Sequence, residues 1–190
     1  MKTLLIENST DRGTLAMADD GEIVFRRNFA RSGDMAAAIQ EFFLAVGVPD
    51  EIVVGIGPGS YTGLRVAAAT AIGIQAALGC AVSGCPSVLG YPTGSYHVVG
   101  DARLSAVFFA SIEEKRITRG PELISVEEFQ EIRATLCDAP LFAVGSVPGC
   151  DDLQIERPAA EYLIGCRESF VPAIEPLYLK EPHITVKRKA

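Results

Sequence analysis

The amino-acid sequence predicts an α/β protein made of two lobes of similar size. Its 190 residues, 48% of them hydrophobic, can bury a core but are close to the size at which one compact unit becomes two. Segments with strand periodicity alternate with segments of helical periodicity through the first half of the chain. A Gly- and Pro-rich stretch near residues 84–95 is a candidate linker, which divides the chain into lobes 1–94 and 95–190.

The first lobe is predicted to begin with three strands, because short apolar runs there are separated by turn residues. These strands cover residues 3–7, 14–18 and 22–28. A helix follows over 34–46, where apolar residues recur at helical spacing before Gly47. A buried strand at 51–56 then leads into a helix over 62–78. This order of elements is that of a ribonuclease-H-like half.

The second lobe is predicted to repeat parts of this order with less helix. Its expected strands cover residues 95–103, 104–112 and 141–145, and its expected helices cover 125–133 and 158–170. Ser125 is an apt N-cap for the shorter helix, with Glu128 three residues later. A Pro-bracketed extended segment is expected at 175–182.

Charge disfavours direct binding of nucleic acid. The formal net charge is -7 and the sequence pI is about 4.9, so the protein as a whole repels a phosphate backbone. The basic run Lys187-Arg188-Lys189 is an exception that is typical of a frayed tail.

Cysteine usage and the N-terminal sequence predict a cytoplasmic protein. The five cysteines form no Cys-x-x-Cys pair, which argues against a disulfide framework and a thiolate zinc site. The opening "MKTLLIENSTDRG" does not fit a signal peptide. The most apolar segment, Leu64–Leu78, is shorter than the roughly 20 residues of a membrane span, so no membrane association is expected.

The glycine-rich loop "GPGSYTGLR" at residues 57–65 lies between the predicted strand and helix. It lacks the lysine of a phosphate-binding P-loop, and it also misses the dinucleotide fingerprint. A helix N-terminus with free amides and an arginine one turn in would still attract an anion. The candidate anion- or nucleotide-binding residues are therefore Gly57, Gly59, Ser60, Thr62, Gly63 and Arg65. The alternative, which spacing alone favours, is a tight turn in which glycines allow close packing.

The helix at 62–78 is apolar on two opposite sides, which indicates that both sides are covered. One stripe contains Leu64, Ala67, Ala68, Ala71, Ile74 and Leu78. The other contains Val66, Ala69, Gly73, Ala76 and Ala77. Small residues at intervals of four would let another helix approach to the short end of the usual 8–10 Å range. Either a partner protein or the helix at 34–46 covers this stripe. The candidate partner interface adds Met35, Ile39 and Phe42 of that earlier helix to the second stripe.

No catalytic residue is predicted. The two histidines, His97 and His183, are far apart and fit no metallopeptidase spacing. Ser60 lacks a nucleophile elbow, because the position that needs glycine is Thr62. Three carboxylates, Glu7, Asp11 and Asp101, form a weak candidate magnesium site if they meet in a cleft, although acids at strand ends are equally common as turn formers.

The segment "GPGSYTGLRVAAATAIGIQAALG" closely resembles the signature Gly-Pro-Gly-Ser-Phe/Tyr-Thr-Gly-Leu-Arg of the TsaB (YeaZ) family. Further segments are similar to the family in the same order: "LLIENST", "GDARLSAVFFA", "GPELIS", "AVGS" and "EPLYLKEP". The resemblance therefore extends over nearly the whole chain. It departs from the family at Glu7 and Asn8, where the family has Asp and Thr, and within "RSGD", where the family has a histidine.

The resemblance implies a two-lobed actin/sugar-kinase/Hsp70-like fold with a reduced second lobe. It also implies a non-catalytic accessory subunit that dimerises through first-lobe helices with TsaD, the catalytic paralogue that makes threonylcarbamoyladenosine next to the tRNA anticodon. A TsaE-like ATPase would join the assembly, tRNA would be contacted only through the complex, and the chain alone would form a homodimer. ATP and Mg²⁺ at the subunit joint remain open. The alternatives are an actin-like ATP-binding or ATP-hydrolysing enzyme and, disfavoured by the scattered histidines, a glycoprotease-type metallopeptidase.

Overall fold

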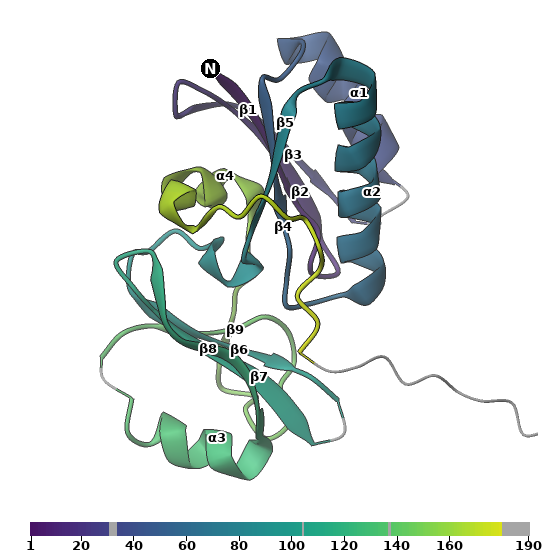
Figure 1. Ribbon diagram of the computed structural model, residues 1–190. Coiled ribbons are helices and arrows are strands. Elements are labelled where there is room, and N and C mark those ends of the chain that lie inside the picture. The colour runs from purple at the N-terminus through teal and green to yellow at the C-terminus, as the bar shows by residue number, and fades with distance from the viewer. Residues whose placement is uncertain (31–33, 104, 137, 180–190) are drawn as a thin grey trace, which may run out of the picture.

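The computed structural model describes residues 1–30, 34–103, 105–136 and 138–179. Two lobes are stacked end to end, each built around one five-stranded sheet (Figure 1). His183, the basic run near the C-terminus, Cys137 and most of the "RSGD" segment lie outside the described residues. Within them, no helix has both the length and the apolar character needed to cross a membrane.

The first sheet has the strand order β3-β2-β1-β4-β5. Its strands are β1 (Lys2–Glu7), β2 (Gly13–Asp19), β3 (Glu22–Phe29), β4 (Glu51–Gly55) and β5 (Ala81–Cys85). β1 and β2 pair antiparallel, as do β2 and β3, whereas β1, β4 and β5 run parallel. Two helices connect the later strands: α1 (Met35–Val46) leads from β3 to β4, and α2 (Tyr61–Leu78) leads from β4 to β5. This confirms the predicted ribonuclease-H-like order of the first half.

The second sheet repeats the same topology in the order β10-β9-β6-β7-β8. Its elements are β6 (Tyr96–Asp101), β7 (Ala106–Glu113), β8 (Arg116–Ser125), α3 (Val126–Arg133), β9 (Leu141–Ala143) and β10 (Gln154–Ile155). β6 corresponds to β1 and β9 to β4, because each pair occupies the same place in its sheet. The connection from β9 to β10 contains no helix, so the second lobe lacks a counterpart of α2. The two-lobed fold with a reduced second lobe is thus confirmed.

The inner strands of the first sheet are buried on both faces, and β1 shows how their side chains are divided. Leu4 and Ile6 point to the face covered by α1 and α2, whereas Leu5 points to the opposite face. The short helix α4 (Ala160–Leu163) lies on that opposite side (Figure 1). Because both faces are covered, the central strand carries an unbroken apolar run in place of alternation.

The chain crosses between the lobes twice, and the two crossings lie side by side. The outgoing one contains the 3-10 helix η2 (Ser87–Leu89), and the returning one leads into α4 and the 3-10 helix η3 (Ile164–Ser169). The Ala159 N–H donates to the Gly90 carbonyl at 2.8 Å, which joins the crossings directly. α4 packs on β1 and β2, so the chain returns to the first sheet after residue 159. The division into lobes at residue 94 stays a prediction.

After η3, an extended segment of residues 170–179 runs along the first lobe towards the second. Val171 and Gly84 exchange two backbone hydrogen bonds of 2.9 and 2.7 Å, and the Leu177 N–H donates to the Ile56 carbonyl. The Tyr178 ring then packs on Tyr61, at the start of α2, with ring centroids 5.3 Å apart. The extended segment therefore ends beside the glycine-rich loop.

Three strands lie outside the predicted ones: β5, β8 and the two-residue strand β10. The predicted linker near 84–95 overlaps the end of β5, which pairs in parallel with β4 along its whole length. The stretch at 116–125 contains Gly120-Pro121, which would interrupt a central strand. β8 is an edge strand with an irregular register opposite Phe109–Ile112, and a proline is tolerated in that position.

Candidate functional site

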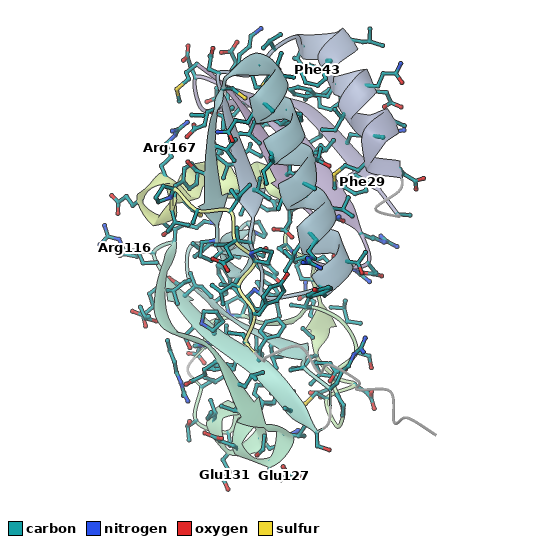
Figure 2. All side chains as sticks on the ribbon, turned by 45° about the vertical axis from the view of Figure 1, so that its right-hand side comes forward. Phe29, Phe43, Arg116, Glu127, Glu131 and Arg167 are labelled. Atoms are coloured by element: carbon teal, nitrogen blue, oxygen red, sulfur yellow. The ribbon has the colours of Figure 1, made fainter. Side chains whose placement is uncertain are left out.

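An open groove lies on the outer side of the first lobe, between the end of α1 and the length of α2. Its volume is about 450 Å³. It is lined by Phe43, Val48, Ala69, Thr70, Gly73, Ile74, Ala77 and Leu78. Phe43, labelled in Figure 2, lies where the two helices come together. We call this surface the α1–α2 groove.

The α1–α2 groove is apolar and exposed. Of its lining residues, Val48 is 56% exposed and Leu78 is 42% exposed, although both side chains are hydrophobic. The Thr70 hydroxyl is satisfied by its own helix, since it donates to the Val66 carbonyl at 2.8 Å. The two helices carry only two charged side chains, Arg65 and Glu41.

Three residues of the second stripe of α2, Ala69, Gly73 and Ala77, line this groove. Ala69, Gly73, Ala76 and Ala77 are exposed and Val66 is half-buried, so α1 does not cover them. A Cβ atom added at Gly73 would meet nothing within 4 Å. The alternative in which the helix at 34–46 fills this side within one chain is therefore wrong.

The three candidate residues of α1 lie elsewhere. Met35, Ile39 and Phe42 are buried in the core between α1 and the first sheet, with exposed fractions of 1%, 9% and 0%. Their placement as partner-facing residues is corrected: helical periodicity identified one face of α1, and that face packs on its own sheet. The exposed apolar side chains of this region, Leu44 and Val48, were missed because they fall outside that periodic set.

A second candidate site is the cleft between the lobes, with a volume of about 540 Å³. It forms where the carboxyl ends of β1 and β4 face those of β6 and β9. The segments that line it are 9–11 and 59–62 from the first lobe, and 100–103 and 144–146 from the second. Open α/β sheets commonly bind ligands at the carboxyl ends of their strands.

The glycine-rich loop packs tightly against the turn after β1. A Cβ at Gly59 would lie 2.2 Å from the Ser9 carbonyl oxygen, and one at Gly57 would lie 2.8 Å from Leu64 Cδ1. Gly57 also has a φ of 98°, which favours glycine. These contacts support the tight-turn interpretation of the loop.

Two backbone N–H groups of this loop already donate hydrogen bonds to acceptors within the protein. The Ser60 N–H donates to the Ser9 carbonyl at 2.6 Å, and the Gly63 N–H donates to the Ser60 side chain, which is the N-cap of α2. Thr62 is exposed and lines the cleft. The Arg65 guanidinium lies over the Tyr61 ring at 4.7 Å. Anion binding at this loop stays a prediction.

The three candidate magnesium ligands are not brought together. Glu7 is 1% exposed beneath the loop, where its Oε1 accepts the Ser9 N–H at 2.7 Å, and burial raises the pKa of its carboxyl. Asp11 and Asp101 both line the cleft. Among the described residues, no three His, Cys, Asp or Glu side chains are placed to hold a metal ion. The magnesium site with Glu7 as a ligand is therefore not supported.

Asp11 and Asp101 each have another partner. Asp11 forms a bidentate ion pair with Arg157, at 2.6 and 3.0 Å, and the hydrogen bond from Arg157 holds the pKa of Asp11 below its usual value. Asp101 accepts the Arg103 N–H at 2.8 Å. The ion pair of Asp11 joins the turn after β1 to the returning interlobe crossing. The contact of Asp101 is that of a side chain that stabilises a turn.

Sequence comparison identifies the family. The family model described as "TsaD: tRNA N6-adenosine threonylcarbamoyltransferase" matches residues 31–133, more than half of the chain. Rv3421c from Mycobacterium tuberculosis is 31% identical over 156 residues, which cover 78% of this chain and 72% of that protein. ML0378 from Mycobacterium leprae is 40% identical over 91 residues, which cover 46% of this chain and 25% of that protein.

Comparison with solved structures supports the same fold. A Pseudomonas aeruginosa protein described as similar to peptidase YEAZ superposes with a TM-score of 0.69 at 20% identity, covering 94% of this chain and 99% of the other. YeaZ from the same organism superposes with a TM-score of 0.66, also at 20% identity and with the same coverage. The chain therefore belongs to the TsaD-like family, and it shares the fold of the two YeaZ-type structures.

Proposed function

We propose that this chain is a non-catalytic subunit that supports threonylcarbamoyl transfer to the adenosine next to the tRNA anticodon by dimerising with a TsaD-like catalytic paralogue. The α1–α2 groove is the observation that carries the proposal. It is an apolar, nearly uncharged surface on two helices, open to solvent in the isolated chain.

The shape of the groove favours a helix as its occupant. Ala69, Gly73 and Ala77 lie one turn apart along exposed α2, so an incoming helix can approach closely along this line. The exposed side chains of Val48 and Leu78, which also line the groove, would pack on the flanks of that helix. A paralogue with the same topology would have helices equivalent to α1 and α2, and one of these helices could pack in the groove.

The arrangement of partners in the proposal follows from the same surface. A paralogue occupying the groove leaves the interlobe cleft and the second lobe free for a TsaE-like ATPase. Without the paralogue, two copies of the chain would cover each other's grooves, because an exposed apolar patch tends to associate. The net charge of -7 favours contact with tRNA only through the complex.

The test has a cellular arm and a biochemical arm. Depletion of the chain in its native host is expected to lower threonylcarbamoyladenosine in total tRNA, measured by nucleoside mass spectrometry, and re-expression of the wild-type chain is expected to restore it. The tagged chain is expected to copurify with the TsaD-like paralogue. An unchanged nucleoside profile after depletion, together with no copurification, would overturn the proposal.

A second candidate function is ATP binding in an actin-like enzyme, and the interlobe cleft is the observation that favours it. Its hydroxyl-bearing residues Ser60 and Thr62 lie at the N-terminus of α2, opposite Asp101 and Arg103. Calorimetric titration of the isolated chain with ATP and Mg²⁺ separates the two proposals. Saturable heat at micromolar ATP would favour the enzyme, and its absence would remove it.

A further inference from the structure

The turn between β7 and β8 reaches from the second lobe into the junction between the lobes. Its loop consists of Glu114 and Lys115 alone, because the residues on either side already pair with each other. The Glu114 N–H donates to the Ser95 hydroxyl at 3.2 Å. The Lys115 N–H donates to the Gly94 carbonyl at 2.8 Å. These two hydrogen bonds hold the β7–β8 turn against the end of the outgoing crossing.

The β7–β8 turn has a backbone conformation that its residues do not favour. Glu114 has a φ of 49° and Lys115 has a φ of 64°, so both lie in the left-handed region. Two-residue hairpin loops of this kind favour asparagine and glycine, because longer side chains raise the free energy of that conformation. Such a conformation persists where other contacts compensate for it. The Lys115 side chain makes contacts of this kind.

The Lys115 side chain is half-buried and contacts three parts of the junction. Its ammonium donates to the carbonyl of Tyr91, in the outgoing crossing. The same nitrogen lies 5.9 Å from the ring centroid of Tyr96, at the start of β6, and 5.9 Å from that of Tyr162, in α4. Aromatic faces attract a cation at this range. Because α4 packs on β1 and β2, Lys115 joins the second-lobe hairpin to the first lobe.

Two of the tyrosines around Lys115 are themselves fixed by contacts with the crossings. The Tyr91 hydroxyl donates to the Glu156 carbonyl of the returning crossing at 3.3 Å. The Tyr96 hydroxyl donates to the Val88 carbonyl of the outgoing crossing at 2.9 Å. Both tyrosines are fully buried. The Lys115 ammonium therefore binds to side chains and backbone that have little freedom to move.

Two further features connect the lobes at this junction. Arg116, labelled in Figure 2, forms an ion pair with Glu168 of η3, with 2.5 Å between Nη2 and Oε2. Both side chains are exposed, so water screens this pair and it contributes little by itself. The apolar core at the junction is shared, since it contains Leu5 of the first sheet and Val98 of the second. A rotation of one lobe against the other would separate these groups.

We propose that the β7–β8 turn is a latch that holds the two lobes at one angle, and that the Lys115 side chain makes its decisive contacts. Two-lobed proteins can close a cleft by rotation about the segments that connect the lobes. Here those segments are the two crossings. Lys115 is bonded to the outgoing one and packs on the helix that follows the returning one. With the latch in place the interlobe cleft keeps its opening, and a ligand that enters it binds without closure of the lobes.

The distance between two spin labels, one in each lobe, tests the latch in the full-length chain. Glu22, in β3, and Glu131, in α3, are exposed positions for the labels. A genetically encoded ketone amino acid at each position avoids labelling the cysteines, and an excess of unlabelled chain suppresses distances between chains. Pulsed electron paramagnetic resonance is expected to give one narrow distance distribution for the wild type. Lys115→Met keeps most of the side-chain length but removes the ammonium, and it is expected to broaden the distribution to about twice the wild-type width.

Arg119→Met is the matched control. The Arg119 guanidinium lies over the Phe109 ring at 5.4 Å and forms an ion pair with Glu122, so a cation on an aromatic ring of the same hairpin is removed within the second lobe. Its distribution should stay as narrow as that of the wild type. Tyr162→Leu removes the ring on the first-lobe side of the Lys115 contact and should broaden the distribution as Lys115→Met does. It provides the test if Lys115→Met does not fold.

Three results would overturn the inference. The first is a broad distribution in the wild type, which would show that the lobes already rotate. The second is a wild-type width in folded Lys115→Met or folded Tyr162→Leu. The third is an equal broadening in Arg119→Met, which would show that the effect is not specific to the junction. A general loss of stability does not broaden the distance distribution of the folded chain. The α1–α2 groove takes no part in this test, so its outcome leaves the proposed function unaffected.

Discussion

Gly63 of α2 is pressed against Asn8 at the end of β1. The Asn8 side chain donates to the Gly63 carbonyl at 2.9 Å, and a Cβ atom on Gly63 would lie 2.0 Å from the Asn8 carbonyl oxygen. Backbone meets backbone at this point, so neither side can yield by changing a rotamer. The contact fixes where α2 begins, and with it the position of the α1–α2 groove.

Gly63→Ala should therefore destabilise the first lobe. We expect the free energy of unfolding to fall by about 1–3 kcal/mol, the usual cost of overpacking, despite the better helix propensity of alanine. Gly73→Ala in the same helix is the matched control, because its Cβ meets nothing within 4 Å. That control should be stabilised by up to about 1 kcal/mol in a urea titration. Equal effects of the two substitutions would show that the contact with Asn8 does not constrain the helix.

Glu7→Gln tests the buried carboxyl beneath the glycine-rich loop. Burial raises the pKa of Glu7 above its ordinary value of 4.5, so the folded state holds the proton more tightly than the unfolded state. The stability that this group contributes is therefore present below pH 4.5 and is lost as pH rises through the folded pKa. Glu7→Gln should reduce the fall in unfolding free energy over that range, measured by denaturant titration at several pH values.

Glu131→Gln on α3 provides the control for that series. The Glu131 side chain points away from the second sheet into solvent (Figure 2), so its substitution should leave the pH profile unchanged. If Glu7→Gln reproduced the wild-type profile, burial of Glu7 would not be the source of the pH dependence.

Leu78→Glu tests self-association through the groove. The wild-type chain alone is expected to form a concentration-dependent dimer in analytical ultracentrifugation at micromolar concentrations. A carboxylate at the rim of the groove would be desolvated in that dimer, so the variant should sediment as a monomer. Ile155→Glu, at a similarly exposed apolar position on β10, should dimerise like the wild type. A wild-type chain that stays monomeric throughout the range would contradict the prediction.

Titration with Mg²⁺ alone tests the placement of the carboxylates. Asp11 and Asp101 have protein partners, and Glu7 lies outside the cleft lining, so no saturable heat is expected. Micromolar binding that Asp101→Asn removes would show that the cleft assembles a cation site after all.

Helical and strand periodicity predicted most of the elements but not those defined by their neighbours. β5 contains Gly84 and a single β-branched residue, Val82, so its local propensity is weak. It is a strand because β4 offers it a parallel partner. The ion pair between Asp11 and Arg157 joins residues 146 positions apart, a contact that no local pattern encodes.

The candidate interface was predictable on α2 and not on α1. α2 is apolar on both sides, and the stripe richer in small residues is the one left exposed. On α1 the strongest periodic face belongs to the core, as Phe42 shows, while the exposed Leu44 stands alone. Periodicity identifies the apolar faces of a helix. Whether the sheet covers a given face depends on the tertiary arrangement, which periodicity does not contain.

The most direct test of the central claim is Gly73→Leu, compared with Gly165→Leu, in copurification with the TsaD-like paralogue. Neither added side chain meets protein atoms within 4 Å of its Cβ, but Gly73 lies in the α1–α2 groove and Gly165 lies in η3. The account predicts that both variants fold, that Gly165→Leu copurifies like the wild type, and that Gly73→Leu does not. Recovery of the paralogue with folded Gly73→Leu at wild-type yield would contradict it.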